Sequence, residues 1–335
     1  MNRITRRTAG LALLAGVAGL CMTPTAHAAE KKTLIVAEPV HSTGYLPLYV
    51  AIHSGFFPDN IEVKIITTEG GGAHTNAVLT KQAFAFIGGP EHNAFAKIKG
   101  AELRAVANVV DRGNVYYVAK TGLAPKPGQS MADFFKGKSI AVSFFGGTPN
   151  SITRYLLAEW KLDAKKDVVL KEMSNGAVIA AVKTGNADIG VTTEPILTRG
   201  IVQKIWGEPI YNIPKELGPY AYSTLNVRLD SIKEEPEVVA AFVKGVVKGL
   251  KLTYAEPDKA VAIAKKEFPT MSTEDLKATL DRSFTDQMWS KDGMVSAESW
   301  KTGGMVVRNA GILKKDVAYD EIIDMQFVKA ALAMK

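Results

Sequence analysis

The polar and apolar positions from Lys32 onward alternate between two spacings. Short apolar runs of strand length, such as "TLIVAE", "IEVKIITT" and "AFAFIGG", are separated by segments in which apolar residues recur every three or four positions. In the first such segment, Leu46, Tyr49, Val50 and His53 have helical spacing, and Gly55 ends the pattern. Because parallel strands need a crossover connection, this alternation predicts parallel βαβ units and an α/β fold.

The same alternation starts again with the strand-like run "KSIAVSFFGG" and continues to "ADIGVTTEP". At an offset of 104 residues, six of sixteen positions are identical, among them the pairs Gly72 and Gly176, and Thr80 and Thr184. Frequent alanine and glycine inflate such a match, so it does not establish a duplication. It falls where each half repeats one helix-to-strand step, and it therefore predicts two similar α/β lobes.

The chain becomes helical after Pro236, which suits a first helical turn. In the segment that follows, one apolar stripe is formed by Val239, Phe242, Val243, Val246 and Leu250. The simplest arrangement places residues 29–118 and 220–335 in lobe 1 and residues 119–219 in lobe 2. The chain then crosses between the lobes twice, in "NVYYVAK" and "PYAYSTLN".

Residues 1–28 have the pattern of an export signal. Arg3, Arg6 and Arg7 precede the apolar run "LALLAGVAGLCM", which is too short to span a bilayer, and "AHA" offers small residues for cleavage after Ala28. The pair Arg6 and Arg7 leaves twin-arginine export open beside ordinary secretion, although no bulky apolar residue follows it. We therefore expect a periplasmic protein.

The composition, charge and cysteine content of the chain argue against several classes of function. The chain is 47% hydrophobic and 22% charged, and its formal net charge of +7 becomes about +4 without the three signal arginines. The lysines are scattered over helix-like segments and no nucleic-acid motif is present. Cys21 is the one cysteine, and bulky Leu20 before it argues against lipid anchoring. Its loss with the signal would exclude disulfides, thiolate metal sites and cysteine catalysis.

Ligands of open α/β sheets bind beyond the carboxyl ends of the strands, where loops lead into helices. The predicted strands identify six such loops. They are "EPVHSTGY" (38–45), "EGGGAHTN" (69–76), "GGPEHN" (88–93), "FFGGTPNS" (144–151), "MSNG" (173–176) and "TTEP" (192–195).

Two of these loops offer exposed backbone N–H groups at a helix start. In residues 144–151 we expect Thr148 to be the N-cap and Pro149 to lie in the first turn, with Gly146 and Gly147 leaving amides open to a ligand. Such a helix start attracts an anion or a polarised oxygen. The run "GGGAHTN" has the same character, although either stretch could also be only a capped helix start.

Several side chains in these loops could bind a ligand. Glu194 follows an apolar strand and precedes a proline, so we expect its carboxylate to point into the cleft and to receive a ligand N–H or cation; a solvent-facing acid is the alternative. Aromatic side chains in the loops and crossings could stack on a ligand or only pack. They are Tyr45, Phe144, Phe145, Tyr220 and Tyr222.

No catalytic or metal signature emerges. His41, His74 and His92, with Glu91 beside the last, have no ligand-like spacing, so we expect no metal and no cofactor. The run "GGTPNS" lacks the lysine of a phosphate-binding loop. A serine elbow and a dinucleotide fingerprint are also missing, which argues against an enzyme.

Four further segments, in their order and spacing, carry a resemblance to a known family. They are "YLPLYVAIHSGFF", "ADIGVTTEP", "DSIKEEPEVVAAFVKGVVKGL" and the tail from "WSKDGMVSAESW" to "GILKKDVAYDEIIDMQFV". With them the mature chain resembles the type II solute-binding proteins of ABC importers, in the group that binds sulfonates, taurine, nitrate and thiamine pyrimidines. The resemblance implies a two-lobed periplasmic-binding-protein fold with a cleft that closes on one small solute, and a membrane permease as partner.

The resemblance also implies a set of ligand-binding residues. They are Tyr45, Gly71, Gly72, Gly89, Glu91, Gly147, Thr148, Asn150, Ser151 and Glu194. Phe84 stands where many relatives carry an acid, and the six loops hold no arginine or lysine. We therefore expect a nitrogen-bearing heterocycle or amine, with an aliphatic sulfonate or taurine as the second choice. An enzyme resembling thiamine-pyrimidine synthases is the rival function, and we expect a monomer without a nucleic-acid partner.

The signal predicts a mature chain that begins at or near Ala29. Intact-mass measurement of periplasmic material should give the mass of residues 29–335. A retained and lipidated Cys21 would contradict this prediction.

Overall fold

The computed structural model describes residues 31–334. The predicted signal, its cleavage site and Cys21 lie outside the described residues. Within residues 31–334, the helices are all too short or too polar to cross a membrane.

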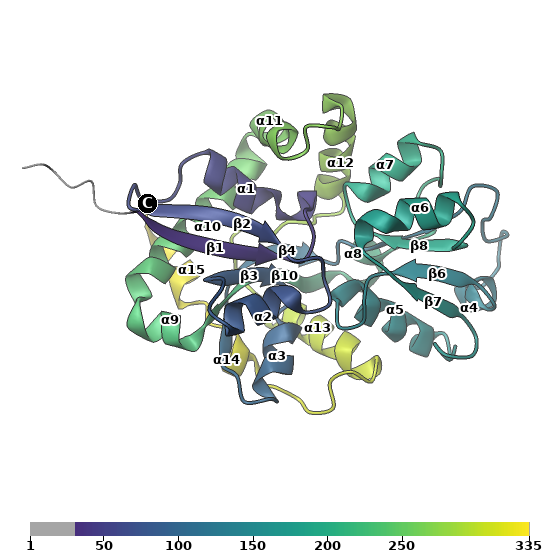
Figure 1. The fold of residues 1–335 in the computed structure, drawn as a ribbon, viewed down its shortest axis with the longest axis horizontal. Coiled ribbons are helices and arrows are strands. Elements are labelled where there is room, and N and C mark those ends of the chain that lie inside the picture. Colours follow the sequence, from purple (N-terminus) through teal and green to yellow (C-terminus); the bar gives the residue numbers. More distant parts are fainter. Residues whose placement is uncertain (1–30, 335) are drawn as a thin grey trace, which may run out of the picture. The chain divides into compact units, whose positions relative to one another are not determined.

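The first sheet contains five strands in the order β2-β1-β3-β10-β4 (Figure 1). β1 (Lys32–Glu38) pairs in parallel with β2 (Ile61–Thr67) and with β3 (Ala85–Gly88), as the alternating pattern predicts. β10 (Pro219–Arg228) is inserted antiparallel between β3 and β4 (Leu103–Arg112). The sheet is therefore mixed, because β10, which comes from a distant part of the chain, runs antiparallel to both of its neighbours.

The second sheet repeats this arrangement in the order β7-β6-β8-β5-β9. β6 (Ser139–Val142) pairs in parallel with β7 (Val169–Glu172) and β8 (Ile189–Thr192). β5 (Tyr116–Ala119) lies antiparallel between β8 and β9 (Tyr211–Asn212). Both sheets thus combine a parallel trio with one strand of opposite direction, β10 or β5, and an edge strand beyond it that again runs in the direction of the trio.

The offset of 104 residues found in the sequence also relates the two sheets. Val36 pairs with Ala85 in the first sheet, and Ile140 pairs with Ile189 in the second. Both members of the pair are shifted by the same 104 positions, and so are the bounds of β3 and β8. The sequence match therefore corresponds to one strand register built twice.

Helices cover the two sheets and connect their strands. Around the first sheet they are η1 (Thr43–Tyr45), α1 (Leu46–His53), α2 (Ala73–Leu79), α3 (Glu91–Lys97), α9 (Leu229–Glu234), α10 (Pro236–Ala255), α11 (Pro257–Glu267), α12 (Thr273–Thr285), α13 (Ala297–Asn309), α14 (Tyr319–Ile322) and α15 (Gln326–Ala333). Around the second they are α4 (Met131–Phe135), α5 (Thr148–Glu159), η2 (Asn175–Ala177), α6 (Val178–Lys183), α7 (Ile196–Val202) and α8 (Ile213–Leu217).

α10 packs its apolar stripe into the core of the first-sheet half. The five stripe residues predicted from the sequence are fully buried, and Pro236 stands in the first turn, as expected. Gly249 on this helix approaches α1 so closely that a Cβ there would lie 2.2 Å from the carbonyl oxygen of Pro47. The long helix therefore needs a glycine where it meets the first helix.

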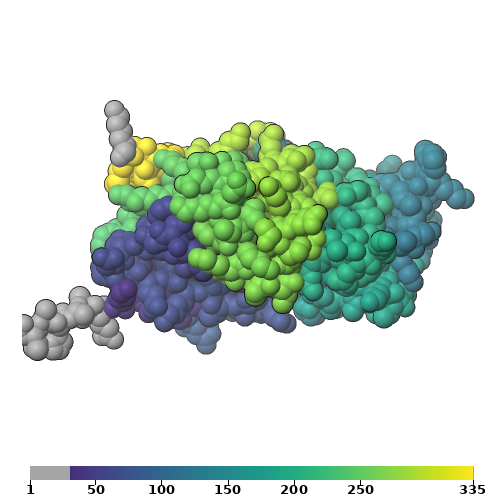
Figure 2. Space-filling model, turned by 90° about the horizontal axis from the view of Figure 1, so that it is seen from above, coloured from purple at the N-terminus to yellow at the C-terminus, as the bar shows by residue number. Residues whose placement is uncertain are grey.

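The chain passes between the sheets twice, after β4 ends at Arg112 and again at Gly218 before β10. β5, from Tyr116, pairs only within the second sheet. The lobe limits at residues 118 and 220 stay a prediction. Figure 2 shows the light green segment that contains α11 and α12 between the purple and teal parts of the chain.

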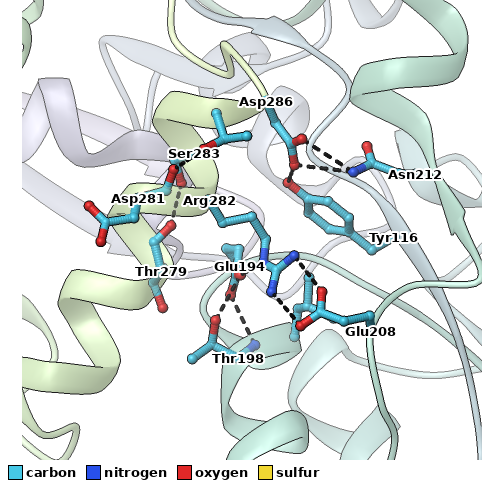
Figure 3. Close-up of polar contacts among 12 residues, drawn as sticks. Tyr116, Glu194, Thr198, Glu208, Asn212, Thr279, Asp281, Arg282, Ser283 and Asp286 are labelled. Carbon is cyan, nitrogen blue, oxygen red and sulfur yellow. Dashed lines mark hydrogen bonds and ion pairs between the residues drawn. The ribbon is translucent and has the colours of Figure 1, made fainter.

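A polar network joins α12 to the second-sheet half (Figure 3). Arg282 lies between two acids: its Nε is 3.2 Å from Glu194 Oε1, and its terminal nitrogens donate to Glu208 at 2.8 and 3.1 Å. One turn further, Asp286 accepts a 2.8 Å hydrogen bond from the Tyr116 hydroxyl and a weaker one from Asn212. These contacts place α12 against strands and helices that come much earlier in the chain.

Glu194 is fully buried within this network. Its carboxylate accepts hydrogen bonds from the backbone N–H and the hydroxyl of Thr198, at 3.1 and 2.8 Å. Burial nevertheless raises the pKa of Glu194 to about 7, because these hydrogen bonds and the charge of Arg282 only partly offset the loss of water. The folded protein therefore binds a proton here at a pH where the unfolded chain has released it.

This difference in pKa predicts that Glu194 makes stability fall as pH rises. Between the ordinary value of 4.5 and about 7, the contribution of Glu194 to the free energy of unfolding decreases by about 1.4 kcal/mol per pH unit. Glu194→Gln should remove that slope in urea unfolding at pH 5, 6 and 7.

The matched control is Glu62→Gln, because a hydrogen bond from Lys64 lowers the pKa of exposed Glu62. This control should keep the parental slope. Equal slopes for the parent and Glu194→Gln would contradict the assignment.

Candidate functional site

A cavity of about 310 Å³ lies between the two sheets at the carboxyl ends of their parallel strands. All six loops selected from the sequence contribute to its wall. The first-sheet loops supply Pro39, Val40, His41, Tyr45, Glu69, Gly70, Gly71, His74, Gly88, Gly89 and His92; the second-sheet loops supply Phe144, Gly147, Thr148, Pro149, Met173, Ser174, Asn175, Gly176 and Thr193.

The cavity also includes residues that the sequence analysis did not select. Thr67, Ser143 and Val191 are at or next to the last residue of a parallel strand. Tyr222 and Ser223 come from antiparallel β10, and Ile196 begins α7. The strand-end residues could have been found by extending each loop back by one or two positions. The β10 residues required knowledge of which strand is inserted beside β3.

The predicted ligand-binding residues divide into two groups. Five of them line the cavity: Tyr45, Gly71, Gly89, Gly147 and Thr148. Five others do not: Gly72, Glu91, Asn150, Ser151 and Glu194. Gly72 is the N-cap of α2, with φ of 87°, so a glycine suits this position even without a ligand contact.

The start of α5 differs from the prediction by one residue. Gly147, with φ of −83° and ψ of 148°, is the N-cap, so the prediction that Thr148 caps the helix is wrong. The Thr148 hydroxyl instead donates a 2.6 Å hydrogen bond to Glu91 Oε1 on α3. Pro149 stands in the first turn, as predicted.

Asn150 and Ser151 point back into their own half of the molecule. Asn150 Nδ2 donates to the Ser143 carbonyl at 2.8 Å and to Glu172 Oε1 at 3.1 Å. The Ser151 hydroxyl donates to the Gly147 carbonyl at 3.3 Å. Both residues therefore stabilise the loop that carries the cavity-lining residues of α5.

Glu194 also lies behind the cavity wall. Its carboxylate contacts Thr198 and Arg282, its carbonyl accepts a 2.7 Å hydrogen bond from the Ser42 hydroxyl, and its N–H donates to Asn114 Oδ1. This geometry does not support the expectation that the Glu194 carboxylate receives a ligand N–H. Within residues 31–334, the Glu194 carboxylate instead connects the second-sheet half to Arg282 on α12.

The aromatic candidates also have different positions. Tyr45, Phe144 and Tyr222 line the cavity. Tyr220 is fully buried and does not, and Phe145 is 55% exposed with the Arg154 guanidinium 5.1 Å from its ring centre. Burial raises the pKa of Tyr45 and Tyr222 well above the ordinary value, so both present neutral hydroxyls to a ligand.

His41 forms one wall of the cavity between two acids. Its Nδ1 lies 2.9 Å from Glu38 Oε1 and its Nε2 lies 3.4 Å from Glu267 Oε2. Burial lowers the pKa of His41, but the hydrogen bond and charge of Glu38, with those of Glu267, raise it above the ordinary value overall. The ring also stacks on Phe268 with centres 4.6 Å apart.

His74 and His92 meet on another wall, with ring centres 4.7 Å apart and planes at 78°. Burial, and secondarily the charge of His92, lower the pKa of His74 well below its ordinary value, so His74 is neutral. Within residues 31–334 no three His, Cys, Asp or Glu side chains are placed to hold a metal ion. These histidines therefore supply hydrogen bonds and ring faces to the cavity.

The wall has a definite chemical character. Of the described residues that line it, none is lysine or arginine, and Glu69 is the acid. The other lining residues are apolar or aromatic residues, glycines, residues with a hydroxyl or imidazole group, and the carboxamide Asn175. Such a wall can hold a small ring or chain by contact with apolar groups and orient it with a few hydrogen bonds.

Comparison with known proteins places the chain in a family. Residues 42–260 match the family model described as NMT1/THI5 like. YtlA of Bacillus subtilis (strain 168), named as a candidate binding protein, is 24% identical over 305 residues, which are 90% of each chain. The 4-amino-5-hydroxymethyl-2-methylpyrimidine phosphate synthase of Uromyces fabae is 24% identical over 295 residues, which are 82% of each chain.

A solved structure gives the same fold. The zinc-bound ligand-binding component of an ABC-type import system from Staphylococcus aureus superposes with a TM-score of 0.72 and 15% identity, over 90% of this chain and 99% of that one. At this identity the likeness concerns the fold alone. The protein is therefore a member of the NMT1/THI5-like family with the two-lobed α/β fold of periplasmic binding proteins.

Proposed function

We propose that this protein is an exported solute-binding protein that captures one small molecule between its lobes and delivers it, without chemistry, to the permease of an ABC importer. The observation that carries the proposal is the cavity of about 310 Å³ built from loops of both sheets. A ligand in that place contacts both halves at once, so its binding energy favours the closed form. The likeness to an import component from Staphylococcus aureus supports the same function.

We propose a nitrogen-bearing heterocycle or amine of thiamine-pyrimidine type as the ligand. The cavity volume is at the small end of ligand pockets, which suits a single substituted ring. Tyr45, Phe144 and Tyr222 offer ring faces, while Thr148, Ser223 and Asn175 offer donors and acceptors. A nitrate or sulfonate group would find no lysine or arginine in the wall, and its cationic partners would be limited to protonated imidazoles such as His41.

An enzyme of the pyrimidine-synthase class is the rival function, and the relative from Uromyces fabae carries that name. Residues 31–334 contain no cysteine, so these residues offer no thiol for catalysis. A binding protein should release its solute unchanged. Mass spectrometry after prolonged incubation with the protein should therefore recover the intact solute, and a new product would favour the enzyme.

The ligand class can be measured by calorimetric titration. We expect 4-amino-5-hydroxymethyl-2-methylpyrimidine to bind with Kd of about 10 μM or tighter, and taurine, methanesulfonate and nitrate to bind at least about tenfold more weakly. Gly147→Val should weaken binding at least about tenfold, because a Cβ at Gly147 already lies 3.1 to 3.2 Å from Ser143 Oγ and the Phe144 carbonyl.

The control is Gly176→Ala, another glycine of the cavity wall, where an added Cβ meets no atom within 4 Å. It should bind like the parent. Tighter binding of a sulfonate than of the pyrimidine would overturn the ligand class while leaving a binding protein, and a parental Kd for Gly147→Val would place the ligand elsewhere.

Lobe closure is a separate prediction. Small-angle scattering should give a smaller radius of gyration at saturating solute than without it, because the connections near residues 113–115 and Gly218 can act as hinges. The same profile in both conditions, with binding shown by calorimetry, would contradict closure.

A further inference from the structure

His92 makes two hydrogen bonds that a neutral imidazole cannot make together. Its Nδ1 lies 3.0 Å from the Gly89 carbonyl oxygen and its Nε2 lies 3.0 Å from the Gly146 carbonyl oxygen. A carbonyl oxygen only accepts, so both ring nitrogens must donate. Neutral imidazole has one N–H, and therefore this geometry requires the imidazolium form.

The second of these hydrogen bonds joins the first-sheet half to the second-sheet half. His92 belongs to α3 beside the first sheet, whereas Gly146 belongs to the loop between β6 and α5 of the second sheet. The Thr148 hydroxyl crosses in the other direction to Glu91 Oε1 at 2.6 Å. We call these two contacts, made by Glu91, His92, Gly146 and Thr148, the α3–α5 bridge.

The surroundings of His92 suit a buried cation. Glu91 on the same helix is fully buried, and within residues 31–334 its Oε2 has no hydrogen-bond partner. A Cβ at Gly89 would lie 2.0 Å from that oxygen, so the carboxylate packs against the same residue whose carbonyl accepts from His92. A buried cation is stabilised by acidic or carbonyl partners, and Glu91 is the acid next to His92 on α3.

The other groups that face His92 add no competing charge. From α2 comes His74, whose pKa burial lowers well below its ordinary value; from β3 comes the ring of Phe86, and from α3 the ring of Phe95. From β10, Tyr220 and Tyr222 lie near Glu91, and their pKa values are raised well above the ordinary value by burial. None of these neighbouring groups brings a positive charge to His92, so the two carbonyl acceptors decide that both of its ring nitrogens donate.

We propose that His92, as an imidazolium, and Glu91 are positioning residues that hold the first turn of α5 over the cavity, so that capture of the solute takes up a proton at His92. The bridge fixes Gly147 and Thr148, both of which line the cavity, from the first-sheet side. On its own side that loop is held by Asn150 through Ser143 and Glu172. The part of the cavity wall that α5 forms is therefore held from both sides when the α3–α5 bridge is present. Deprotonation of His92 removes one of the two hydrogen bonds of this bridge.

This inference rests on the proposed function, and its consequence is a pH-dependent affinity. Kd for the pyrimidine should rise by about tenfold or more between pH 6 and pH 8 in the parent. His92→Gln, whose two N–H groups lie on one nitrogen and do not titrate, should bind about tenfold more weakly at pH 6 and depend less on pH than the parent, although His41 and Glu194 still titrate in both proteins. His53→Gln, which removes an imidazole bonded to Glu267 outside the cavity, should keep the parental slope.

The protonation state can be observed directly by NMR of the full mature chain labelled with ¹⁵N-histidine. Residues 31–334 contain four histidines, so His92→Gln assigns the signal of interest by its disappearance. With the pyrimidine bound at pH 7, both ring nitrogens of His92 should carry protons. A single neutral tautomer at this pH would overturn the proposal.

Small-angle scattering without solute tests the α3–α5 bridge independently of the proposed ligand. Without any solute, the parent should be more compact at pH 6 than at pH 8, and His92→Gln should show less of this difference. Thr148→Val, which replaces the hydroxyl with a methyl group, should be less compact than the parent at pH 6. An unchanged radius of gyration in all three would refute the bridge even if the pyrimidine binds. Failure of the pyrimidine to bind, with the scattering difference present, would refute the ligand and leave the bridge.

Discussion

The parallel pairing of β1 with β2 and β3, and of β6 with β7 and β8, is the constraint on which the site depends. Parallel strands bring the carboxyl ends of neighbours to one edge, so every loop that follows them emerges on the same side. Because both sheets have this pairing, two sets of loops come to face each other. The cavity is the space that these loops enclose.

The two antiparallel strands decide how the halves are connected. β5 and β10 each run against their parallel neighbours, and the chain enters and leaves the second sheet next to them. The long helical tail then returns to the first-sheet half, where α10 buries its stripe against α1. Burial of this apolar surface stabilises that half, and the segments near Asn114 and Gly218 connect it to the second sheet.

Polar groups that are buried at the junction determine how the two halves meet. Glu194 and Glu91 are both fully buried, and each is held by residues from the opposite half, Arg282 in one case and Thr148 in the other. Removal of a carboxylate from water is costly unless charged or hydroxyl donors replace the water. Since Arg282 and Thr148 each belong to the half opposite the acid that they contact, the junction favours one mutual arrangement over many, which a purely apolar contact would not do.

Much of this architecture could be predicted from the sequence, because it depends on spacing along the chain. The strand and helix periods, the stripe of α10, the repeat at 104 residues and the six loops all follow from positions that are close in sequence. The direction of individual side chains could not be predicted in the same way. Glu194 was expected to face the ligand and Thr148 to cap its own helix, yet each has a partner from a distant segment, Arg282 and Glu91. An ion pair or hydrogen bond to such a partner outweighs a local preference, so only the tertiary structure decided which polar residues line the cavity and which hold its two halves together.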